Sequence, residues 1–562
     1  MIKIKKGVNS VPDILKIKLL KTGKILEYPE GITLEAIAKE HQKLYDSEIV
    51  AVRVNNDIKE LFKTLDKDSE IDFIDLTDED GVKIYQRGLT FLTYVASLEV
   101  FPDKVLKVRH SLGKGLYCEF DGWTPSKEDI DKIKEKMRDL VEEDIPFVKK
   151  ELYKFDALEL FKKHGMYDKI ELLKYRTKST INVYWCGKYF NYYYGYMVPS
   201  TSYIKLFDLI KVNNGFVLVH PDITSPNALP AYVPQPKMSK AYEDRERWAK
   251  IVDMENVGDL NKLVSSGRAR ELIMMCELLH EKEISRIADD ITSRDNVKLV
   301  LISGPSSSGK TTFSKRLALQ LRVNGFKPYP MSLDDYFVER DKTPVGPDGK
   351  PDFESLKALD LELFNHVLNS VFEGKEVEIP KFNFKTGKRE YKGNVIKPTD
   401  RTILIVEGIH GLNPELTNED DSLKYRIYVS ALTQMDLDND NRIPTTDVRI
   451  VRRMVRDYKF RGHSALKTLQ MWPSVRLGEE RNIFPYQENA NVMFNSALPY
   501  ELAILKNFVT PLLLQVDNST SVYSQARRLI RFLDYFLPIV DFDVIPSTSI
   551  IREFIGGSYF HY

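Results

Sequence analysis

The sequence has few cysteines and no long apolar run. Its 562 residues include only Cys118, Cys186 and Cys276. Three widely spaced cysteines argue against a disulfide framework and favour a reducing, cytoplasmic environment. No run of 18 apolar residues occurs, and the first ten residues lack the apolar centre of a signal peptide. We therefore expect a soluble chain without membrane segments.

The chain also lacks an excess of charge. Lys+Arg and Asp+Glu each number 82, so no global positive field draws it to nucleic acid or to an anionic membrane, although a local basic patch stays open. The composition, 43% hydrophobic and 29% charged, is that of a soluble globular protein. A chain of this length exceeds one core and predicts roughly three or four domains.

Residues 297–312 hold the most specific motif. The sequence VKLVLISGPSSSGKTT is an apolar strand-like run, then a phosphate-binding P-loop, then a helix-forming stretch to about Arg322. Two glycines let backbone N–H groups face phosphate oxygens at a helix N-terminus. Lys310 supplies a cation for the β- and γ-phosphates, and the Thr311 hydroxyl suits Mg²⁺. The predicted nucleotide-binding residues are Gly304, Pro305, Ser306, Ser307, Ser308, Gly309, Lys310, Thr311 and Thr312.

Carboxylates follow two further predicted strands, at 327–332 and 402–406. Asp334 and Asp335 follow the first strand, and Glu407 follows the second. The carboxyl ends of parallel strands face the ligand crevice. There Asp334 can accept the proton of an acceptor hydroxyl or help to hold Mg²⁺, and Glu407 can orient the waters of the metal. Asp335 has an alternative interpretation as a helix cap or turn residue.

Arginines recur at helical spacing in DVRIVRRMVRDYKFRGH, residues 447–463. Spacings of three and four place several of them on one helix face, from which they could close over a transferring phosphate. Such a helix alone is more typical of a solvated face. The order of P-loop, aspartate, glutamate and arginine helix favours the catalytic interpretation. The arginines are Arg449, Arg452, Arg453, Arg456 and Arg461.

These motifs have a familiar order. Residues 297 to about 505 resemble the uridine kinase and phosphoribulokinase group of P-loop kinases, through GPSSSGKTT, SLDDYF, PDFESLKALDLELF, IPKFNFKTGKR, ILIVEGIHGL and RRMVRDYKFRGH. The resemblance implies that ATP and Mg²⁺ are the cofactors and that Asp334 is the general base for a 5′-hydroxyl. It assigns Lys310 and Thr311 to phosphate and Mg²⁺, Glu407 to the metal side, and Glu354 to the ribose hydroxyls.

The resemblance also locates the nucleoside pocket and the lid. Phe382, Phe384 and Arg389 fall in the pocket motif, and Arg453, Arg456 and Arg461 fall in the lid. Similar uridine kinases carry Tyr, His and Arg where this chain has Phe382, Gly387 and His463. We expect more room beside Gly387 and weaker reading of the base. Arg389 and His463 remain candidates for that task, and ribose recognition through Glu354 should persist.

The N-terminal half resembles a different family. Residues 14–76 are similar to the TGS domain of threonyl-tRNA synthetases, and residues 80 to about 220 to their editing-type domain. The four editing positions of that family fall on Arg87, Phe91, Cys186 and Phe190. One possible ligand of four predicts neither a zinc site nor tRNA deacylation. The aromatic run Tyr189–Tyr196 either stacks bases or packs a sheet, and we favour the sheet.

The predicted fold class is α/β, with a parallel sheet flanked by helices in the P-loop kinase domain. A small β-grasp α+β domain and an α+β editing-like domain precede it. The predicted divisions are 1–78 (TGS-like), 79–225 (editing-like), 226–294 (proline-rich linker and helical bridge), 295–520 (kinase-like) and 521–562 (helical tail).

The leading hypothesis is an ATP-dependent kinase acting on the 5′-hydroxyl of a nucleoside. One alternative is a regulatory protein associated with RNA or the ribosome, in which the P-loop acts as a switch. Another is a kinase for a different small alcohol, such as a sugar phosphate. A switch needs no acceptor pocket, so Asp334, Glu354 and the PKFNFKTGKR segment favour a kinase. The identity of the nucleoside, the oligomeric state and any RNA partner of the N-terminal half are left open.

Overall fold

The computed structural model describes residues 13–346, 349, 351–433 and 435–561. The chain forms two compact units. Unit 1 contains the residues up to Pro234, an inserted segment (Asp436–Arg442) and a second insertion (Val516–Tyr535). Unit 2 contains Gln235–Met435, Ile443–Gln515 and the residues from Phe536 onward. The chain therefore passes between the units five times.

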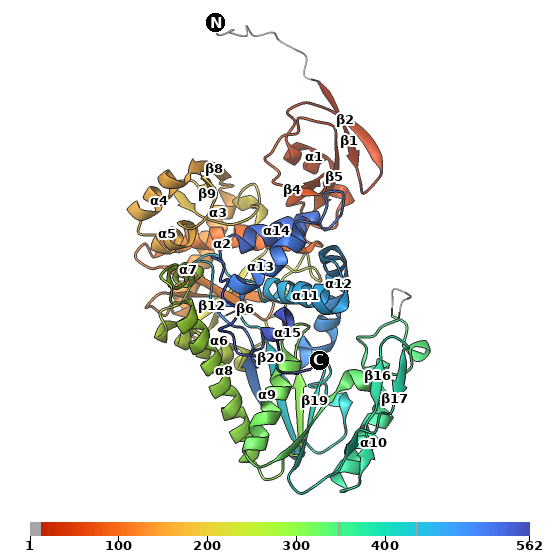
Figure 1. The fold of residues 1–562 in the computed structure, drawn as a ribbon. Helices are drawn as coiled ribbons and strands as arrows, with labels where there is room; N and C mark the ends of the chain where they lie inside the picture. Colours follow the sequence, from red (N-terminus) through yellow and green to blue (C-terminus); the bar gives the residue numbers. More distant parts are fainter. Residues whose placement is uncertain (1–12, 347–348, 350, 434, 562) are drawn as a thin grey trace, which may run out of the picture. The chain divides into compact units, whose positions relative to one another are not determined.

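Unit 1 begins with a five-stranded sheet of order β2-β1-β5-β3-β4 and one helix (Figure 1). β1 pairs antiparallel with β2 and parallel with β5, and its side chains alternate between exposed and buried, as a half-buried strand requires. The Thr33 hydroxyl caps the helix. This arrangement confirms the predicted β-grasp-like part. Its elements are β1 (Ile14–Leu19), β2 (Lys24–Pro29), α1 (Leu34–His41), β3 (Ala51–Val54), β4 (Asp57–Lys59) and β5 (Ser69–Ile74).

Two antiparallel sheets follow in unit 1, of orders β10-β9-β8 and β11-β12-β7-β6. Ser126 and Asp129 form a capping box at the start of α3. The elements are α2 (Glu79–Val100), β6 (Leu106–Leu112), β7 (Gly115–Phe120), α3 (Lys127–Glu142), β8 (Phe147–Tyr153), α4 (Lys154–Lys163), α5 (Tyr167–Leu173), β9 (Thr180–Cys186), β10 (Tyr189–Asn191), β11 (Asp208–Val212) and β12 (Gly215–Val219). The second insertion adds α14 (Tyr523–Leu533).

The aromatic run is only partly in a sheet. Tyr189–Asn191 form β10, whereas Tyr192–Tyr196 lie outside any strand. The expectation that the whole run packs a sheet was therefore wrong for its second part. Tyr192 and Tyr193 are buried, and all five residues from Tyr192 to Tyr196 line a cavity.

The inserted segment is held in unit 1 by a buried cation. Lys169 of α5 is 0% exposed, and its ammonium nitrogen lies 2.5 Å from Asp438 and 2.6 Å from Asp440. Asp168 also contacts Lys169, at 3.3 Å, and accepts a hydrogen bond from the Asn439 backbone N–H. Burial alone would lower the pKa of Lys169, but these carboxylates raise it well above its usual value. Lys169 thus supplies the cation that this acidic cluster needs.

Unit 2 is organised around a parallel sheet of order β14-β19-β13-β20-β21 (Figure 1). Every residue of β13 is buried, as expected for a central parallel strand. The strands predicted at 327–332 and 402–406 correspond to β14 and β19. The strands are β13 (Leu299–Ser303), β14 (Lys327–Ser332), β19 (Thr402–Glu407), β20 (Lys424–Ser430) and β21 (Val492–Asn495).

Helices flank this sheet, which confirms the predicted P-loop α/β architecture. α8 packs against α9, the helix that follows the P-loop. The helices are α6 (Pro236–Ile251), α7 (Val257–Ser265), α8 (Ala269–Thr292), α9 (Lys310–Val323), α11 (Thr445–Arg461), α12 (Ala465–Asn482), α13 (Glu501–Leu513) and α15 (Arg552–Ile555). None of the helices described in the structure is long and apolar enough to cross a membrane.

An arm follows β14 and carries the residues predicted to form the acceptor pocket. It combines one helix with two small antiparallel ribbons, and its core includes Phe364 and Leu368 (Figure 1). Its elements are α10 (Leu361–Phe372), β15 (Val377–Glu378), β16 (Lys381–Asn383), β17 (Lys388–Glu390) and β18 (Val395–Ile396).

Candidate active site

The P-loop connects β13 to α9, as its sequence predicts. Gly309 precedes the helix with φ +84°, a conformation that favours glycine. At Gly304 a side chain is excluded because a Cβ atom would lie 1.9 Å from the carbonyl oxygen of Val429. The two glycines are therefore required by backbone conformation and by close packing against β20, apart from any contact with phosphate.

Lys310 turns toward its own loop. Its ammonium donates hydrogen bonds to the carbonyl oxygens of Gly304, at 2.7 Å, and Pro305, at 3.2 Å. Burial lowers the pKa of Lys310, whereas Glu407 and Asp334 act in the opposite direction. The Lys310 cation thus interacts electrostatically with both predicted carboxylates.

Hard oxygen donors gather at the carboxyl edge of the sheet. The hydroxyl of Thr311 donates to Glu407 at 3.2 Å, and the hydroxyl of Ser332 donates to the same carboxylate oxygen at 3.4 Å. Burial and the nearby Asp334 raise the pKa of Glu407 to about 7, despite the opposing charge of Lys310. An added cation would stabilise the charged form of this buried carboxylate.

The structure separates the two neighbouring aspartates. Asp335 accepts hydrogen bonds from the Phe382 backbone N–H, at 3.2 Å, and from Lys381, at 3.1 Å, so it ties β16 to the sheet edge. Asp334 is solvent-accessible, and surrounding protein and the charge of Asp335 raise its pKa. This geometry fits the turn role considered for Asp335 and leaves Asp334 facing the site.

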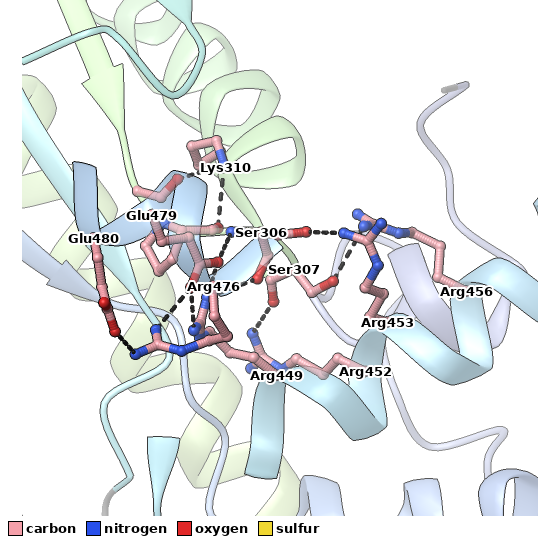
Figure 2. A network of polar contacts seen from close by, with 12 residues as sticks. Ser306, Ser307, Lys310, Arg449, Arg452, Arg453, Arg456, Arg476, Glu479 and Glu480 are labelled. Atoms are coloured by element: carbon pink, nitrogen blue, oxygen red, sulfur yellow. Dashed lines mark hydrogen bonds and ion pairs between the residues drawn. The ribbon is translucent and has the colours of Figure 1, made fainter. Parts of the chain in front are cut away.

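The predicted lid arginines contact the P-loop directly (Figure 2). Arg453 donates to the Ser306 hydroxyl at 2.7 Å, and Arg456 donates to the Ser307 hydroxyl at 3.1 Å. Arg449 also reaches a loop carbonyl, that of Ser306, at 3.3 Å. The buried side of α11 therefore faces the phosphate-binding loop, and these arginines are not a solvated face.

Sequence reasoning missed the acidic partner of this loop. Glu479 of α12 is 2% exposed, and its carboxylate accepts a hydrogen bond from the Ser306 backbone N–H at 2.9 Å. The same carboxylate pairs with Arg449 and with Arg476 (Figure 2). Burial raises its pKa, but the arginines outweigh that effect, so the pKa lies below its usual value. One amide of the P-loop thus already holds an anion.

A second missed carboxylate comes from the end of the chain. Glu553 of α15 accepts a hydrogen bond from Thr312 at 2.7 Å and pairs with Arg456 at 3.3 Å. The ring of Phe554 lies 5.2 Å from the Arg452 guanidinium. These contacts place α15 against both the P-loop helix and α11.

On the acceptor side, Glu354 lies near the P-loop. A Cβ atom on Gly478 would lie 2.8 Å from the Glu354 Cγ atom, so the glycine lets α12 approach. Burial, Glu479 and Asp334 raise the pKa of Glu354 to about 7, against the effect of Arg453. Glu354 therefore shares one electrostatic environment with the predicted catalytic groups.

The predicted base pocket is aromatic on one side. Phe382 and Phe384 lie 5.2 Å apart in an edge-to-face contact, and Phe337 packs against both. Arg389 is paired with Asp360 at 2.7 Å. Because Asp360 already pairs with this guanidinium, Arg389 is less available to read a base than the sequence indicated.

The expected space beside Gly387 is filled. Gly387 has φ +69°, and a Cβ atom there would lie 2.9 Å from the Arg340 Cβ atom. Arg340 also donates a hydrogen bond to the Phe384 carbonyl oxygen at 2.5 Å. The prediction of extra room was wrong, because a neighbouring arginine occupies it.

The last two predicted residues gather around one carboxylate at the end of α11. Arg461 pairs with Asp457 at 3.2 Å, and His463 Nδ1 lies 4.0 Å from the same aspartate. The buried Asp457 also pairs with Arg453 at 3.2 Å. Asp457 thus joins the end of the lid to the arginine that contacts Ser306.

In unit 1 the four editing positions form no ligand set. Phe91 packs against Phe147 and Tyr193, and burial raises the pKa of the Cys186 thiol to about 12. Phe190 packs against Trp185. Arg87 donates to the Tyr196 carbonyl oxygen. Three apolar or cationic replacements do not fit a zinc ion.

Comparison with known proteins matches the kinase-like part and the N-terminal half of the chain to different proteins. Residues 299–501 match the Phosphoribulokinase / Uridine kinase family. Two solved structures are similar to a portion of the chain. A possible uridine kinase from Bacillus stearothermophilus is 18% identical, with 39% of this chain and 100% of that chain covered and a TM-score of 0.27. The D-glycerate 3-kinase from Cryptococcus neoformans is 13% identical, with 45% and 87% covered and a TM-score of 0.20.

The N-terminal half is similar to threonine–tRNA ligases. That of Desulforamulus reducens is 31% identical over 201 residues, and that of Symbiobacterium thermophilum is 30% identical over 200 residues. In both cases the match covers 35% of this chain and 31% of the ligase. The chain thus spans about a third of the length of these relatives.

Proposed function

We propose, from the premise that residues 299–501 form a domain of the phosphoribulokinase and uridine kinase family, that the protein transfers the γ-phosphoryl group of ATP to the 5′-hydroxyl of a ribonucleoside. One observation carries this proposal. Thr311 of the P-loop donates a hydrogen bond to Glu407 at the edge of a parallel sheet, and the charges of Lys310 and Asp334 act on the same carboxylate. A phosphate cradle, hard oxygen ligands and a proton acceptor therefore meet in one place.

The donor set fits Mg²⁺. Thr311, Glu407 and Asp334 offer oxygen atoms, which this ion prefers, and burial of Glu407 raises its pKa, with smaller contributions from Asp334 and Glu553. These three residues would hold the ion, Thr311 through its hydroxyl. Bound there, Mg²⁺ would neutralise charge on the transferring phosphates.

Asp334 is the residue proposed to remove the proton from the acceptor hydroxyl. Its raised pKa makes its carboxylate a better base.

The cations of the site would stabilise the phosphates. To bind phosphate oxygens, Lys310 must release its hydrogen bonds to the carbonyl oxygens of Gly304 and Pro305. Arg453 and Arg456 already contact the loop, where they can stabilise the charge that develops during transfer. The packing of α11 against the loop would also exclude water as a competing acceptor.

Glu354 is proposed to accept hydrogen bonds from the ribose hydroxyls. The aromatic side chains of Phe337, Phe382 and Phe384 offer a surface for the base. Such a surface binds several bases with similar affinity, since it makes few directed hydrogen bonds.

A second acceptor class is supported by a specific observation. Arg389 is paired with Asp360, and Arg340 covers Gly387, so few polar groups remain for reading a base. The same catalytic groups would serve another small alcohol, such as a sugar phosphate. This candidate differs from the first in the acceptor alone.

A panel of ribonucleosides, 2′-deoxynucleosides and sugar phosphates, each with ATP and Mg²⁺, tests the proposal through release of ADP. Acceptor-dependent ADP release supports a kinase and identifies its acceptor. ATP hydrolysis that no acceptor stimulates would favour the alternative of a nucleotide-dependent regulatory protein. Mass spectrometry of the product distinguishes phosphorylation of the acceptor from hydrolysis by water.

A further inference from the structure

Unit 1 contains a cavity of about 340 Å³, outside the P-loop domain. Its walls come from β4, the first turns of α2, β8, β9, the segment Tyr192–Tyr196 and α14. All of these belong to unit 1. The volume lies in the range of small-molecule sites in proteins. None of the catalytic groups proposed above lines it.

The cavity is strongly basic although the whole chain is neutral. Nine Lys or Arg residues line it against four Asp or Glu residues, an excess of five positive charges. The basic residues are Lys59, Lys63, Lys83, Arg87, Lys149, Arg176, Lys178, Arg528 and Arg531. A concave surface of one sign concentrates ligands of the opposite sign.

The acidic residues of the cavity already have partners. Glu60 pairs with Lys149 at 2.8 Å, and Asp57 pairs with Lys59 at 2.6 Å. By contrast, among the described residues no carboxylate lies within 4 Å of the charged nitrogens of Arg87, Arg531 or Lys178. Lys83 and Arg176 pair with Glu79 and Asp534, so the cations available to an added anion include Arg87, Arg531 and Lys178.

The Arg87 guanidinium is fixed in place by the chain around it. It donates to the Tyr196 carbonyl oxygen and lies 5.8 Å from the centre of the Tyr194 ring. Gly195 between them has φ +141°, and a Cβ atom there would lie 2.6 Å from the Arg87 Cζ atom. Burial lowers the pKa of Arg87, as expected for a cation without a counter-ion. The loop thus closes over a desolvated positive charge.

Aromatic rings stand beside these cations. Arg531 donates to the Tyr196 hydroxyl at 2.7 Å and lies 5.6 Å from the centre of that ring. Tyr192 and Tyr535 line the cavity as buried rings, whereas Tyr194 and Tyr196 are partly exposed. Partly exposed rings can stack on a nucleobase, while Lys and Arg side chains bind phosphate.

From this combination we propose that the cavity binds a nucleoside di- or triphosphate. Several unpaired cations match a polyphosphate better than a single phosphate, and the tyrosines match the base. The cavity has the size of a mononucleotide site, whereas an RNA helix needs an extended basic stripe. This proposal is independent of the acceptor used at the P-loop.

Equilibrium dialysis of the full chain with radiolabelled ATP and GTP tests the proposal. The wild type should bind two nucleotides per chain. The variant Lys310→Ala should keep one of these sites, and Arg87→Met in that background should weaken it by about tenfold or more, the effect of losing one charge-assisted hydrogen bond. Lys178→Gln should weaken the same site, and because Lys178 is exposed this change should leave the fold intact.

Arg138→Met is the matched control, since Arg138 is exposed on α3 of the same unit and does not line the cavity. One site per chain that neither Arg87→Met nor Lys178→Gln affects would overturn the proposal. So would equal affinity for inorganic tripolyphosphate, which has no base to stack. Tight binding of single-stranded RNA that ATP and GTP do not displace would also overturn it, in favour of an RNA site.

Discussion

The Glu479 carboxylate accepts a hydrogen bond from the Ser306 backbone N–H at 2.9 Å. The Ser306 amide belongs to the loop that is proposed to bind phosphate. The carboxylate therefore lies where a phosphate oxygen would find a donor, and two anions compete for one amide. Nucleotide binding should therefore require Glu479 to move, or should be weakened by repulsion between the Glu479 carboxylate and the phosphate.

Glu479→Gln should therefore lower the Kd for ATP, by about tenfold if about 1.4 kcal/mol of repulsion is removed. It should also lower the Tm, because Arg449 would lose a buried ionic partner. Isothermal titration calorimetry and thermal unfolding measure the two effects. Glu480→Gln is the control, since Glu480 is the adjacent residue of α12 and pairs with Arg476. Weaker ATP binding by Glu479→Gln would mean that Glu479 orders the loop for its ligand.

Lys310→Ala should lower turnover by at least about a hundredfold, the scale seen when one donor to a transition state is lost. Phosphate would lose the cation that now rests on Gly304 and Pro305. Lys282→Ala, an exposed position on α8, is the control for a lost surface charge. Near-normal turnover of Lys310→Ala with every acceptor that the wild type uses would refute the assignment of phosphoryl transfer to this loop.

Asp334→Asn should reduce turnover by about 10²- to 10⁴-fold while leaving ATP affinity largely intact, because it removes a proton acceptor but keeps the shape. Asp335→Asn should instead raise the KM for the acceptor, since Asp335 holds Lys381 and the Phe382 backbone. Steady-state kinetics on both variants separate these effects. A larger loss of turnover at Asp335 would reverse the roles assigned to the two neighbours.

Acceptor binding should depend on pH through Glu354, whose pKa is raised to about 7. The carboxylate form accepts hydrogen bonds from ribose, so the KM for the acceptor should fall as pH rises through about 7. The raised pKa has the opposite effect on the unliganded fold. Its contribution to stability is complete below the ordinary glutamate pKa and is lost as pH rises through about 7.

Glu354→Gln should flatten the dependence of the acceptor KM between pH 6 and 8 and should reduce that of Tm, part of which remains because the pKa of Glu407 is also raised to about 7. A glutamine cannot titrate, yet it keeps the size of the side chain. If the variant retained the wild-type dependence of KM on pH, another group would have to control acceptor binding.

Uridine should not be preferred over every other ribonucleoside by more than about a hundredfold, the range expected of an apolar pocket. The 2′-deoxynucleosides should be poorer than their ribose counterparts, since they lose a hydroxyl near Glu354. Ratios of kcat/KM across the panel measure both. A strict preference for uridine or cytidine would indicate that polar groups such as Arg340 or His463 read the base.

The P-loop domain could be predicted from local signals. A five-residue buried strand, two glycines and a lysine are adjacent in sequence, and β14 ends at Ser332, as predicted. The β-grasp-like part could also be predicted from the sequence, because helix Leu34–His41 begins at a Thr cap. Such features depend on residues close together in the chain.

The partners of the loop could not be predicted in this way. Glu479 and Glu553 are 173 and 241 residues from the P-loop residues that they contact. An acidic residue on a helix most often faces solvent, so neither stood out in the sequence. Arg340 was missed beside Gly387 for the same reason, since its role depends on how the arm folds back. Only the spatial arrangement reveals these contacts.

The buried Lys169 limits how this chain can be cut into fragments and how its two halves can evolve. Its carboxylate partners Asp438 and Asp440 belong to a stretch of chain that leaves unit 2 and returns to it. A fragment cut near residue 235 would keep both aspartates and lose their lysine. Replacing the N-terminal half with that of a distant relative would likewise leave Asp438 and Asp440 without their lysine. The two halves, each similar to a different family, are therefore no longer interchangeable parts and must change together.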